Sequence, residues 1–302
     1  MKLKTIAILT AIALGLTAIS IWVGQLSYSW LPPQASVESK LVDNLFSFLV
    51  AAGTFIFLGV TGTIVYSILF HRAGRYDLSD GPPIEGNVTL EVVWTAIPFL
   101  LVLWIAVYSY QTYTEMSIRG PMEMAHMLHI SEGIPPAYAE PIDESVEPTT
   151  NIEVEAKQWA WVFRYPEQNI TSTELHLPVD LRTHLVLRSQ EVIHGFYIPA
   201  FRVKQDIIPQ QNIDFEFTPI RTGKYRLRDS QYSGTYFAAM QADVVVESIE
   251  DYQKWLAEAA KNSPSPAPNQ AASEYAQRKE QSAKASWTTV VPASSPMVNY
   301  HP

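Results

Sequence analysis

The chain has 302 residues, a formal net charge of −9 and no cysteine. This length allows one or two domains. The lack of cysteine excludes disulfide bonds, cysteine-ligated metal or iron–sulfur centres, thiol catalysis and an N-terminal lipid-modified cysteine.

Charge is distributed unevenly along the sequence. Residues 1–110 carry five of the 21 basic and six of the 30 acidic residues, which leaves 16 basic and 24 acidic residues, a net of −8, for residues 111–302. The first third is therefore nearly neutral and the rest is acidic. An acidic outer part argues against a nucleic acid as partner.

Three long uncharged runs are predicted to span a membrane. They extend from Thr5 to about Gly24, from Asn44 to Phe70, and from Val92, directly after Glu91, to Tyr110. A bilayer core of about 30 Å needs about 20 helical residues, so each run is long enough to cross it. The first run also fits a cleaved signal peptide. Because it lacks a good small-x-small cleavage site, we favour an uncleaved anchor and expect two to three transmembrane helices.

Basic residues set the expected topology. Lys2 and Lys4 place the N-terminus in the cytoplasm, and Arg72 and Arg75 place the loop after the second run on the same side. Three spans then leave residues 111–302 outside, and cleavage of the first span would not change that side. The outer interface is expected to carry three aromatic anchors, Tyr108, Tyr110 and Tyr113.

The outer part alternates apolar and polar residues over about a hundred positions. Examples are Ile152, Val154 and Ala156, and later Ile213 and Phe215. Several short strands at this spacing predict a β-sandwich or barrel. The segment before them is rich in Pro and Glu and is typical of a linker. The segment after them predicts one short helix and then a disordered tail rich in Ala, Ser, Pro and Gln.

These patterns predict a membrane α plus all-β protein with five segments. They are an N-terminal hydrophobic anchor or signal, a transmembrane helical hairpin, a linker or insertion, the outer β domain, and a short helix with a disordered tail. Their respective bounds are residues 1–26, 27–115, 116–150, 151–250 and 251–302.

Three motifs stand out. They are Asp80-Gly-Pro-Pro-Ile-Glu-Gly-Asn-Val-Thr-Leu-Glu-Val-Val-Trp-Thr-Ala-Ile-Pro98, Gln158-Trp-Ala-Trp161 and Val192-Ile-His-Gly-Phe-Tyr-Ile-Pro-Ala-Phe-Arg-Val-Lys-Gln-Asp206. Together they resemble subunit II of haem–copper terminal oxidases, most of all the cyanobacterial branch. The resemblance covers roughly residues 1–115 and 151–256. It implies a cupredoxin-like β-sandwich for the outer domain, in agreement with the strand pattern.

The resemblance also locates a metal site and shows that its ligands are missing. In cytochrome c oxidases of this family, a dinuclear copper centre is bound by Cys-x-Glu-x-Cys-x-x-x-His-x-x-Met and an upstream His. Soft thiolates suit copper. The corresponding positions here are His194, Asp229, Gln231, Ser233, Phe237 and Met240. Only His194 and Met240 keep their residue types, and Asp229 and Ser233 stand where the two cysteines would be. We therefore expect no dinuclear copper centre and no metal in this chain.

Other residues resemble the quinol oxidases of the same family. Tyr232-Ser-Gly-x-x-Phe-x-x-Met240 is similar to their degenerate site, and Tyr165-Pro-Glu-Gln168 is similar to the same subfamily. In contrast, Lys204, Gln205 and Asp206 keep the pattern of the cytochrome c branch.

The resemblance implies a non-catalytic subunit of a proton-translocating oxidase that reduces oxygen to water. Haem and copper would belong to subunit I. The partners would be subunits I and III, membrane lipid, and quinol as donor to the complex. The protein would lie in a bacterial plasma or thylakoid membrane, with its C-terminal domain on the periplasmic or lumenal side.

The resemblance gives roles to individual residues. Glu91 would lie at the entrance of a proton-uptake pathway in subunit I, although a helix-start carboxylate stabilised by the helix dipole is the alternative. Trp159 and Trp161 match the aromatic electron-input segment, and without copper we expect them to serve packing. His194 is expected to be held by hydrogen bonds. Asp229 could bind a cation or face solvent, and we favour a solvent-facing position.

Two alternatives remain open at this stage. A soluble cytochrome or cupredoxin could dock on an acidic outer face and reduce subunit I directly. That face would include Glu140, Asp143, Glu144, Glu147, Glu153 and Glu155. The chain could instead be a membrane-anchored copper carrier, because thioethers bind Cu(I). Its cluster would be Met122, Met124, His126, Met127 and His129. We rank both below the leading hypothesis, subunit II of a quinol-type oxidase, which the missing copper ligands favour.

Overall fold

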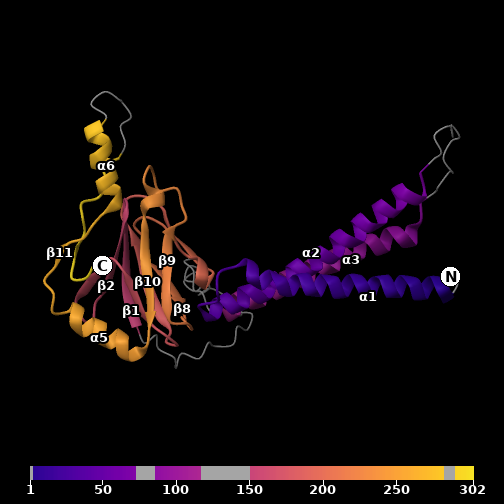
Figure 1. The fold of residues 1–302 in the computed structure, drawn as a ribbon, viewed down its shortest axis with the longest axis horizontal. Helices are drawn as coiled ribbons and strands as arrows, with labels where there is room; N and C mark the ends of the chain where they lie inside the picture. The colour runs from indigo at the N-terminus through magenta and orange to yellow at the C-terminus, as the bar shows by residue number, and fades with distance from the viewer. Residues whose placement is uncertain (1–2, 73–85, 117–149, 282–289) are drawn as a thin grey trace, which may run out of the picture. The chain divides into compact units, whose positions relative to one another are not determined.

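The computed structural model describes residues 3–72, 86–116, 150–281 and 290–302 (Figure 1). They fall into two compact units, Met1–Leu31 with Leu41–Glu115, and Pro32–Lys40 with Met116–Pro302. The Met/His cluster of residues 122–129 and the acidic residues 140–147 lie outside the described residues, so their predicted roles stay predictions.

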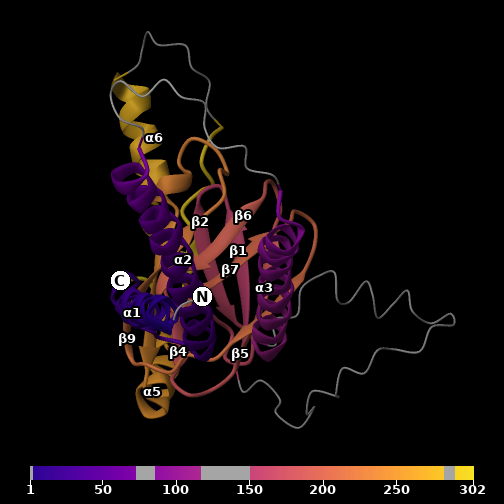
Figure 2. The same cartoon turned by 90° about the vertical axis from the view of Figure 1, so that its right-hand side faces the viewer.

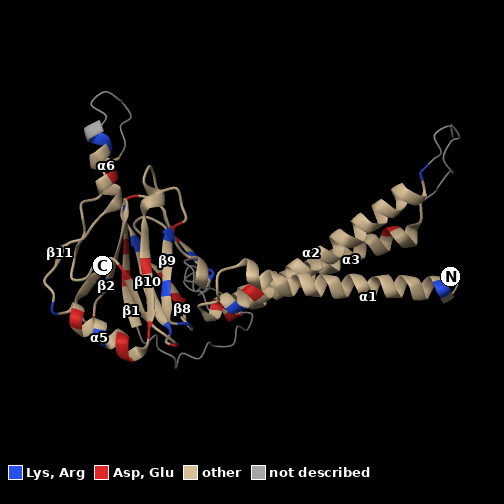
Figure 3. Ribbon diagram, in the orientation of Figure 1, with Lys and Arg blue, Asp and Glu red and all other residues tan. Residues whose placement is uncertain are grey.

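The first unit consists of three long helices. They are α1 (Leu3–Leu26), α2 (Val37–Phe70) and α3 (Val88–Glu115), and a short 3-10 helix η1 (Ser27–Trp30) follows α1. All three are long and apolar enough to cross a membrane. Charged residues are sparse along them and frequent on the strands of the second unit (Figure 3). The three predicted spans are therefore present as helices.

Close helix contacts explain some of the small residues in these spans. The Ser47 hydroxyl donates to the Gly24 carbonyl over 2.8 Å, and a Cβ on Gly24 would come within 2.9 Å of the Ala51 Cβ. Small residues allow such close approach between apolar helices. Phe48 of α2 packs edge-on against Trp104 of α3, with ring centroids 4.5 Å apart.

The second unit is built around a sandwich of two five-stranded sheets. One sheet has the order β3-β2-β1-β5-β8 and the other β4-β10-β9-β6-β7. The strands are β1 (Thr150–Lys157), β2 (Ala160–Tyr165), β3 (Ile170–Ser172), β4 (Leu175–Pro178), β5 (Thr183–Ser189), β6 (His194–Ile198), β7 (Val203–Ile207), β8 (Ile213–Phe217), β9 (Gly223–Asp229) and β10 (Gln241–Glu247).

The alternation of the sequence places the core between the sheets. Ile152, Val154 and Ala156 of β1 are buried, as are Phe215 and Phe217 of β8. Successive side chains of a strand point to opposite faces, so every second residue enters the core. The predicted β-sandwich is confirmed.

Residues 32–40 belong to the sandwich unit, although the sequence indicated a hairpin of residues 27–115. The Ala35 amide donates to the Ala200 carbonyl over 3.1 Å, and the Ile220 amide donates to the Ala35 carbonyl over 2.9 Å. Ser36 and Ser39 exchange backbone-to-hydroxyl bonds at the start of α2, which satisfies amides that have no helical partner. This boundary depends on pairing with distant strands, which local patterns do not reveal.

The predicted short helix is present as α5 (Ile249–Ala259), and the Ser248 hydroxyl caps it by accepting from the Asp251 amide. The expectation of a disordered tail is wrong for the described part of residues 262–302. This part contains β11 (Ser265–Pro266), α6 (Gln270–Gln281) and β12 (Met297–Val298). Helices α5 and α6 lie at opposite ends of the sandwich in both views (Figures 1 and 2).

The tail is ordered because it buries a few apolar side chains despite its polar composition. Ala267, Ala271 and Val298 are all buried. A few well-placed small residues leave no signal in average composition, which explains the wrong prediction.

Candidate functional site

Strand pairing brings the first two former ligand positions together. Strands β6 and β9 are antiparallel neighbours, with Phe196 opposite Asp229. The His194 Nδ1 lies 2.7 Å from the Asp229 Oδ2, and both side chains are fully buried. The pair lies near the start of β6 and the end of β9.

Asp229 accepts hydrogen bonds from four donors. Its Oδ1 accepts from the amides of Gly195 (2.7 Å) and Gln231 (3.0 Å), and its Oδ2 accepts from the Ser233 hydroxyl (2.7 Å) and from His194. Burial raises the pKa of Asp229, but these hydrogen bonds, that from His194 first, outweigh burial and hold the pKa below its ordinary value. An ionised carboxylate only accepts, so the proton of this bond resides on the His194 Nδ1.

The expectation that Asp229 faces solvent is therefore wrong. The residue is 7% exposed, and its side chain points inward. Sequence reasoning treated the carboxylate as a lone charge, for which burial is costly. The chain instead folds four donors around it, and two of them are backbone amides that no motif reveals.

The remaining ligand positions lie in the loop between β9 and β10. The Gln231 Nε2 donates to the Asp206 Oδ2 over 2.8 Å. Phe237 begins the 3-10 helix η3 (Phe237–Ala239) and packs edge-on against the exposed Tyr232, with centroids 5.3 Å apart. Met240 is buried, and its carbonyl accepts from the Asp229 amide over 3.1 Å.

These residues do not fit a dinuclear copper centre. Two bridging sulfurs are needed, and the two positions carry a carboxylate and a hydroxyl, both hard ligands. The Ser233 hydroxyl donates a hydrogen bond to the Asp229 carboxylate over 2.7 Å, and this carboxylate also accepts from the His194 Nδ1. The His194 Nε2 is buried and has no hydrogen-bond partner among the described residues. One free imidazole nitrogen and the thioether of Met240 do not replace two thiolates.

The aromatic motif packs against the same loop. The Trp159 Nε1 donates to the Ser233 carbonyl over 3.2 Å, and the Trp161 Nε1 donates to the Met240 carbonyl over 3.3 Å. Both tryptophans are nearly fully buried, 2% and 3% exposed. Sequence reasoning gave no role to Gln158, whose Nε2 also donates to the Ser233 carbonyl, over 2.6 Å. Both tryptophans thus occupy packing positions.

Glu91 lies far along the chain from this site, in the first turn of α3. The Asn87 side chain accepts from the Leu90 amide over 3.1 Å and caps the helix. Glu91 is exposed in the isolated chain and lines an open depression with Val92, Thr95 and Phe99. This position fits both the helix-start interpretation and the proton-pathway interpretation.

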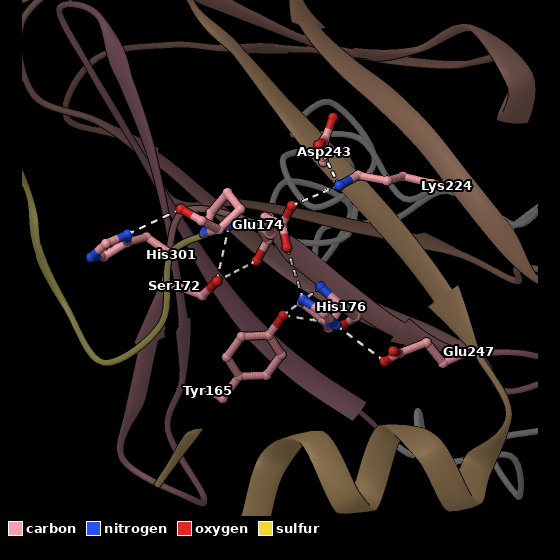
Figure 4. A network of polar contacts seen from close by, with 9 residues as sticks. Tyr165, Ser172, Glu174, His176, Lys224, Asp243, Glu247 and His301 are labelled. Atoms are coloured by element: carbon pink, nitrogen blue, oxygen red, sulfur yellow. Dashed lines mark hydrogen bonds and ion pairs between the residues drawn. The ribbon is translucent and has the colours of Figure 1, made fainter. Parts of the chain in front are cut away.

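A second buried network was missed by sequence reasoning (Figure 4). The His176 Nδ1 lies 3.1 Å from the Glu247 Oε2, and its Nε2 lies 3.4 Å from the Glu174 Oε2. The Lys224 Nζ joins Glu174 (3.1 Å) to Asp243 (2.7 Å). In the sequence, His176 stands between two buried leucines of β4, so alternation indicated a solvent-facing position.

Distant segments cover His176 and bury it. Its ring stacks on Trp255 of α5 at 3.9 Å between centroids, and the Tyr300 ring packs edge-on against it at 5.3 Å. Burial raises the pKa of Glu174. Hydrogen bonds from His176 and Lys224 outweigh the effect of burial, so the pKa of Glu174 is below its ordinary value.

The fold defines a class, a cupredoxin-like β-sandwich that follows three helices able to cross a membrane. Family models agree with this class. The transmembrane-domain model of cytochrome c oxidase subunit II matches residues 20–112, and its periplasmic-domain model matches residues 170–249.

Curated relatives cover most of the chain. "Cytochrome c oxidase subunit 2" of Synechocystis sp. is 35% identical over 88% of this chain and 85% of its own length. "Quinol oxidase subunit 2" of Bacillus subtilis is 26% identical over 82% of this chain and 72% of its own length. The periplasmic domain of subunit II of cytochrome oxidase of Bradyrhizobium japonicum covers 38% of this chain and 95% of its own, at 26% identity and a TM-score of 0.36.

The chain belongs to the subunit II family of haem–copper oxidases. It is thus a membrane protein with a periplasmic C-terminal domain and part of a respiratory oxidoreductase complex with other subunits such as subunit I.

Proposed function

We propose that this chain is subunit II of a quinol-oxidising haem–copper oxidase and carries no redox centre. The observation that carries the proposal is the Asp229 carboxylate, which takes a thiolate position and uses both oxygens to bind four donors. A soluble donor would need an electron relay across the outer domain. Quinol delivers electrons within the membrane and needs no such relay.

The curated relatives are named either cytochrome c oxidase subunit 2 or quinol oxidase subunit 2. Both groups support the family placement, but their names state different electron donors. The cyanobacterial relatives named cytochrome c oxidase subunit 2 are 35% and 34% identical, and the B. subtilis relative named quinol oxidase subunit 2 is 26% identical. Whole-chain identity reports common ancestry, whereas the donor depends on a few residues at one site. The proposal therefore rests on the ligand positions.

In this proposal the chain acts as a scaffold. Its helices pack against subunit I within the lipid, and its sandwich covers the outer face of the complex. Haem and the catalytic copper belong to subunit I, and subunit III completes the assembly. Glu91 accepts protons at the entrance of an uptake pathway, and the complex moves protons while it reduces oxygen to water.

Oxygen consumption by the purified complex tests the proposal. We expect rapid turnover with a quinol and background turnover with reduced cytochrome c at low ionic strength. Low salt is the stringent condition, because it strengthens docking between charged proteins. Rapid, salt-sensitive turnover with cytochrome c alone would overturn the proposal.

A further inference from the structure

The described residues after α5, 263–281 and 290–302, are called the C-terminal segment, and they contact the outer domain at two places. Near its end, the Tyr300 amide donates to the Thr171 carbonyl (3.1 Å), and the Tyr300 carbonyl accepts from the Thr173 amide (3.2 Å). The two ends of the segment are also joined to each other, because β11 pairs with β12 and the Ala267 amide donates to the Pro296 carbonyl over 2.9 Å. The last described residues are therefore held beside β3.

The second place is the end of the sandwich that carries the aromatic motif. The Ala293 amide donates to the carbonyl of Gln158, the residue before Trp159. The guanidinium of Arg278 in α6 lies over the Tyr236 ring, 5.3 Å from its centroid. Tyr236 in turn packs edge-on against Trp159, with centroids 5.2 Å apart. The segment thus contacts Gln158, which precedes Trp159 in the chain, and Tyr236, which packs against the Trp159 ring.

Helix α6 presents one face to the domain. Ala271 is buried in the core cluster, Tyr275 packs against that cluster, and Arg278 reaches Tyr236. Spacings of four and three residues place these side chains on one side of a helix. Asn269 ties the start of this helix down, since its amide nitrogen donates to the Ala293 carbonyl (3.2 Å) and its oxygen accepts from the Ala272 amide (3.2 Å).

Burial at this end is unsuited to a soluble donor. Trp159 and Tyr236 are 2% and 3% exposed, whereas Tyr232 in the same loop is 77% exposed. A soluble electron-transfer protein would therefore meet a covered tryptophan.

We propose that the C-terminal segment is a built-in cover that denies soluble electron-transfer proteins access to Trp159. The cover makes donor choice a property of the chain's surface as well as of its missing copper ligands. This inference rests on the proposed function, because a complex that uses quinol gains from excluding a donor that its outer domain cannot serve.

Hydroxyl-radical footprinting of the purified complex tests the cover. Oxidation of Trp159 and Tyr236 is compared between the full chain and a chain that ends at residue 262. We expect both residues to be protected in the full chain and severalfold more oxidised in the shortened one. Exposed Tyr232 and fully buried Phe215 are internal standards that should not change.

A second variant keeps the test valid if the shortened chain does not fold. Tyr275→Ser with Arg278→Ala removes the contacts of the α6 face and leaves the Tyr300 anchor in place. Lys279→Ala is the matched control for Arg278→Ala, because it removes the same charge from the same turn without removing the ring contact. Equal oxidation of Trp159 and Tyr236 in the full, shortened and doubly substituted chains would overturn the proposal.

Binding of cytochrome c to the immobilised complex at low salt separates a cover from mere packing. We expect the shortened or doubly substituted complex to bind about tenfold more tightly than the intact complex, a difference of about 1.4 kcal/mol. Unchanged affinity despite increased oxidation would show that the segment only packs, and would overturn donor exclusion. Failure of the proposed function has a different signature, namely rapid turnover of the intact complex with cytochrome c.

Discussion

Two histidine–carboxylate networks in the same sandwich differ in burial and in how their charged and polar groups are arranged. The first joins His194 to Asp229, with both side chains fully buried, beside the β9–β10 loop. The second joins His176 to Glu174 and Glu247, and Glu247 keeps a 22% exposed side chain. The first is one carboxylate among four donors. The second places His176 between two carboxylates and continues from Glu174 through Lys224 to Asp243.

The difference shows two ways in which one sandwich stabilises a buried carboxylate. At the positions that we propose correspond to copper ligands, four donors converge on Asp229 in charge-assisted hydrogen bonds. The His176 network contains no former ligand position, yet it has the same residue types. A buried histidine beside a carboxylate therefore does not by itself indicate a metal.

The largest expected effect comes from removing the carboxylate of the first network. Asp229→Ala leaves three donors and the His194 Nδ1 without their acceptor in a buried site. We expect a loss of about 3–5 kcal/mol in unfolding free energy, because each buried donor left without an acceptor costs about 1–3 kcal/mol. Thermal unfolding of the purified complex, followed by near-UV circular dichroism, measures it.

Asp214→Ala is the matched control. Asp214 also pairs with a histidine, His184, over 2.8 Å, but its side chain is 36% exposed. We expect a cost below about 1 kcal/mol. Equal losses for Asp214→Ala and Asp229→Ala would show that the four-donor arrangement does not stabilise the domain.

The second network is expected to be somewhat less sensitive. His176→Ala removes a ring stacked on Trp255 and leaves a cavity between α5 and β4. We expect a loss of about 2–3 kcal/mol, in the range for truncating a buried side chain. His176→Gln should recover part of it by donating to Glu247. A loss greater than that for Asp229→Ala would reverse the order of the two networks.

Acid should weaken both networks. Asp229 and Glu174 have pKa values below their ordinary values, because hydrogen bonds to the charged forms outweigh the opposing effect of burial. A group with a depressed folded-state pKa stabilises fully above its unfolded value, about 3.9 for Asp and about 4.3 for Glu, and this stabilisation is lost as pH falls through the folded value.

The unfolding midpoint should therefore be steady near neutral pH and fall below about pH 4. Asp229→Asn should reduce this acid slope, because the substituted residue no longer titrates. A slope that is the same in Asp229→Asn and in the unmodified chain would assign acid sensitivity to other groups.

The smallest expected effect on stability comes from Glu91, which belongs to neither network and is exposed in the chain. Glu91→Gln should change the unfolding midpoint little but lower quinol-driven turnover severalfold if the residue passes protons. Glu115→Gln, at the other end of α3, is the control. Equal turnover in both variants would favour the helix-start interpretation.

Local patterns in the sequence predicted the helices and strands but not the contacts that bury polar side chains between them. Alternation at Ile152 and Val154 located strands, and uncharged runs located the three helices, because periodicity is a local property. The burial of Asp229 and His176 depends on backbone amides, on Trp255 of α5 and on Tyr300 near the C-terminus. These contacts join segments far apart in the chain, so neither buried network could be predicted.

The central claim is that the former ligand positions of this chain hold no copper. Copper content of the purified complex, determined by mass spectrometry, tests it when the unmodified chain is compared with Met240→Leu and with His194→Gln. Met240→Leu removes the thioether and nearly conserves volume. The account predicts the same copper-to-haem ratio in all three complexes, since that copper would belong to subunit I. A lower ratio in either variant would contradict it.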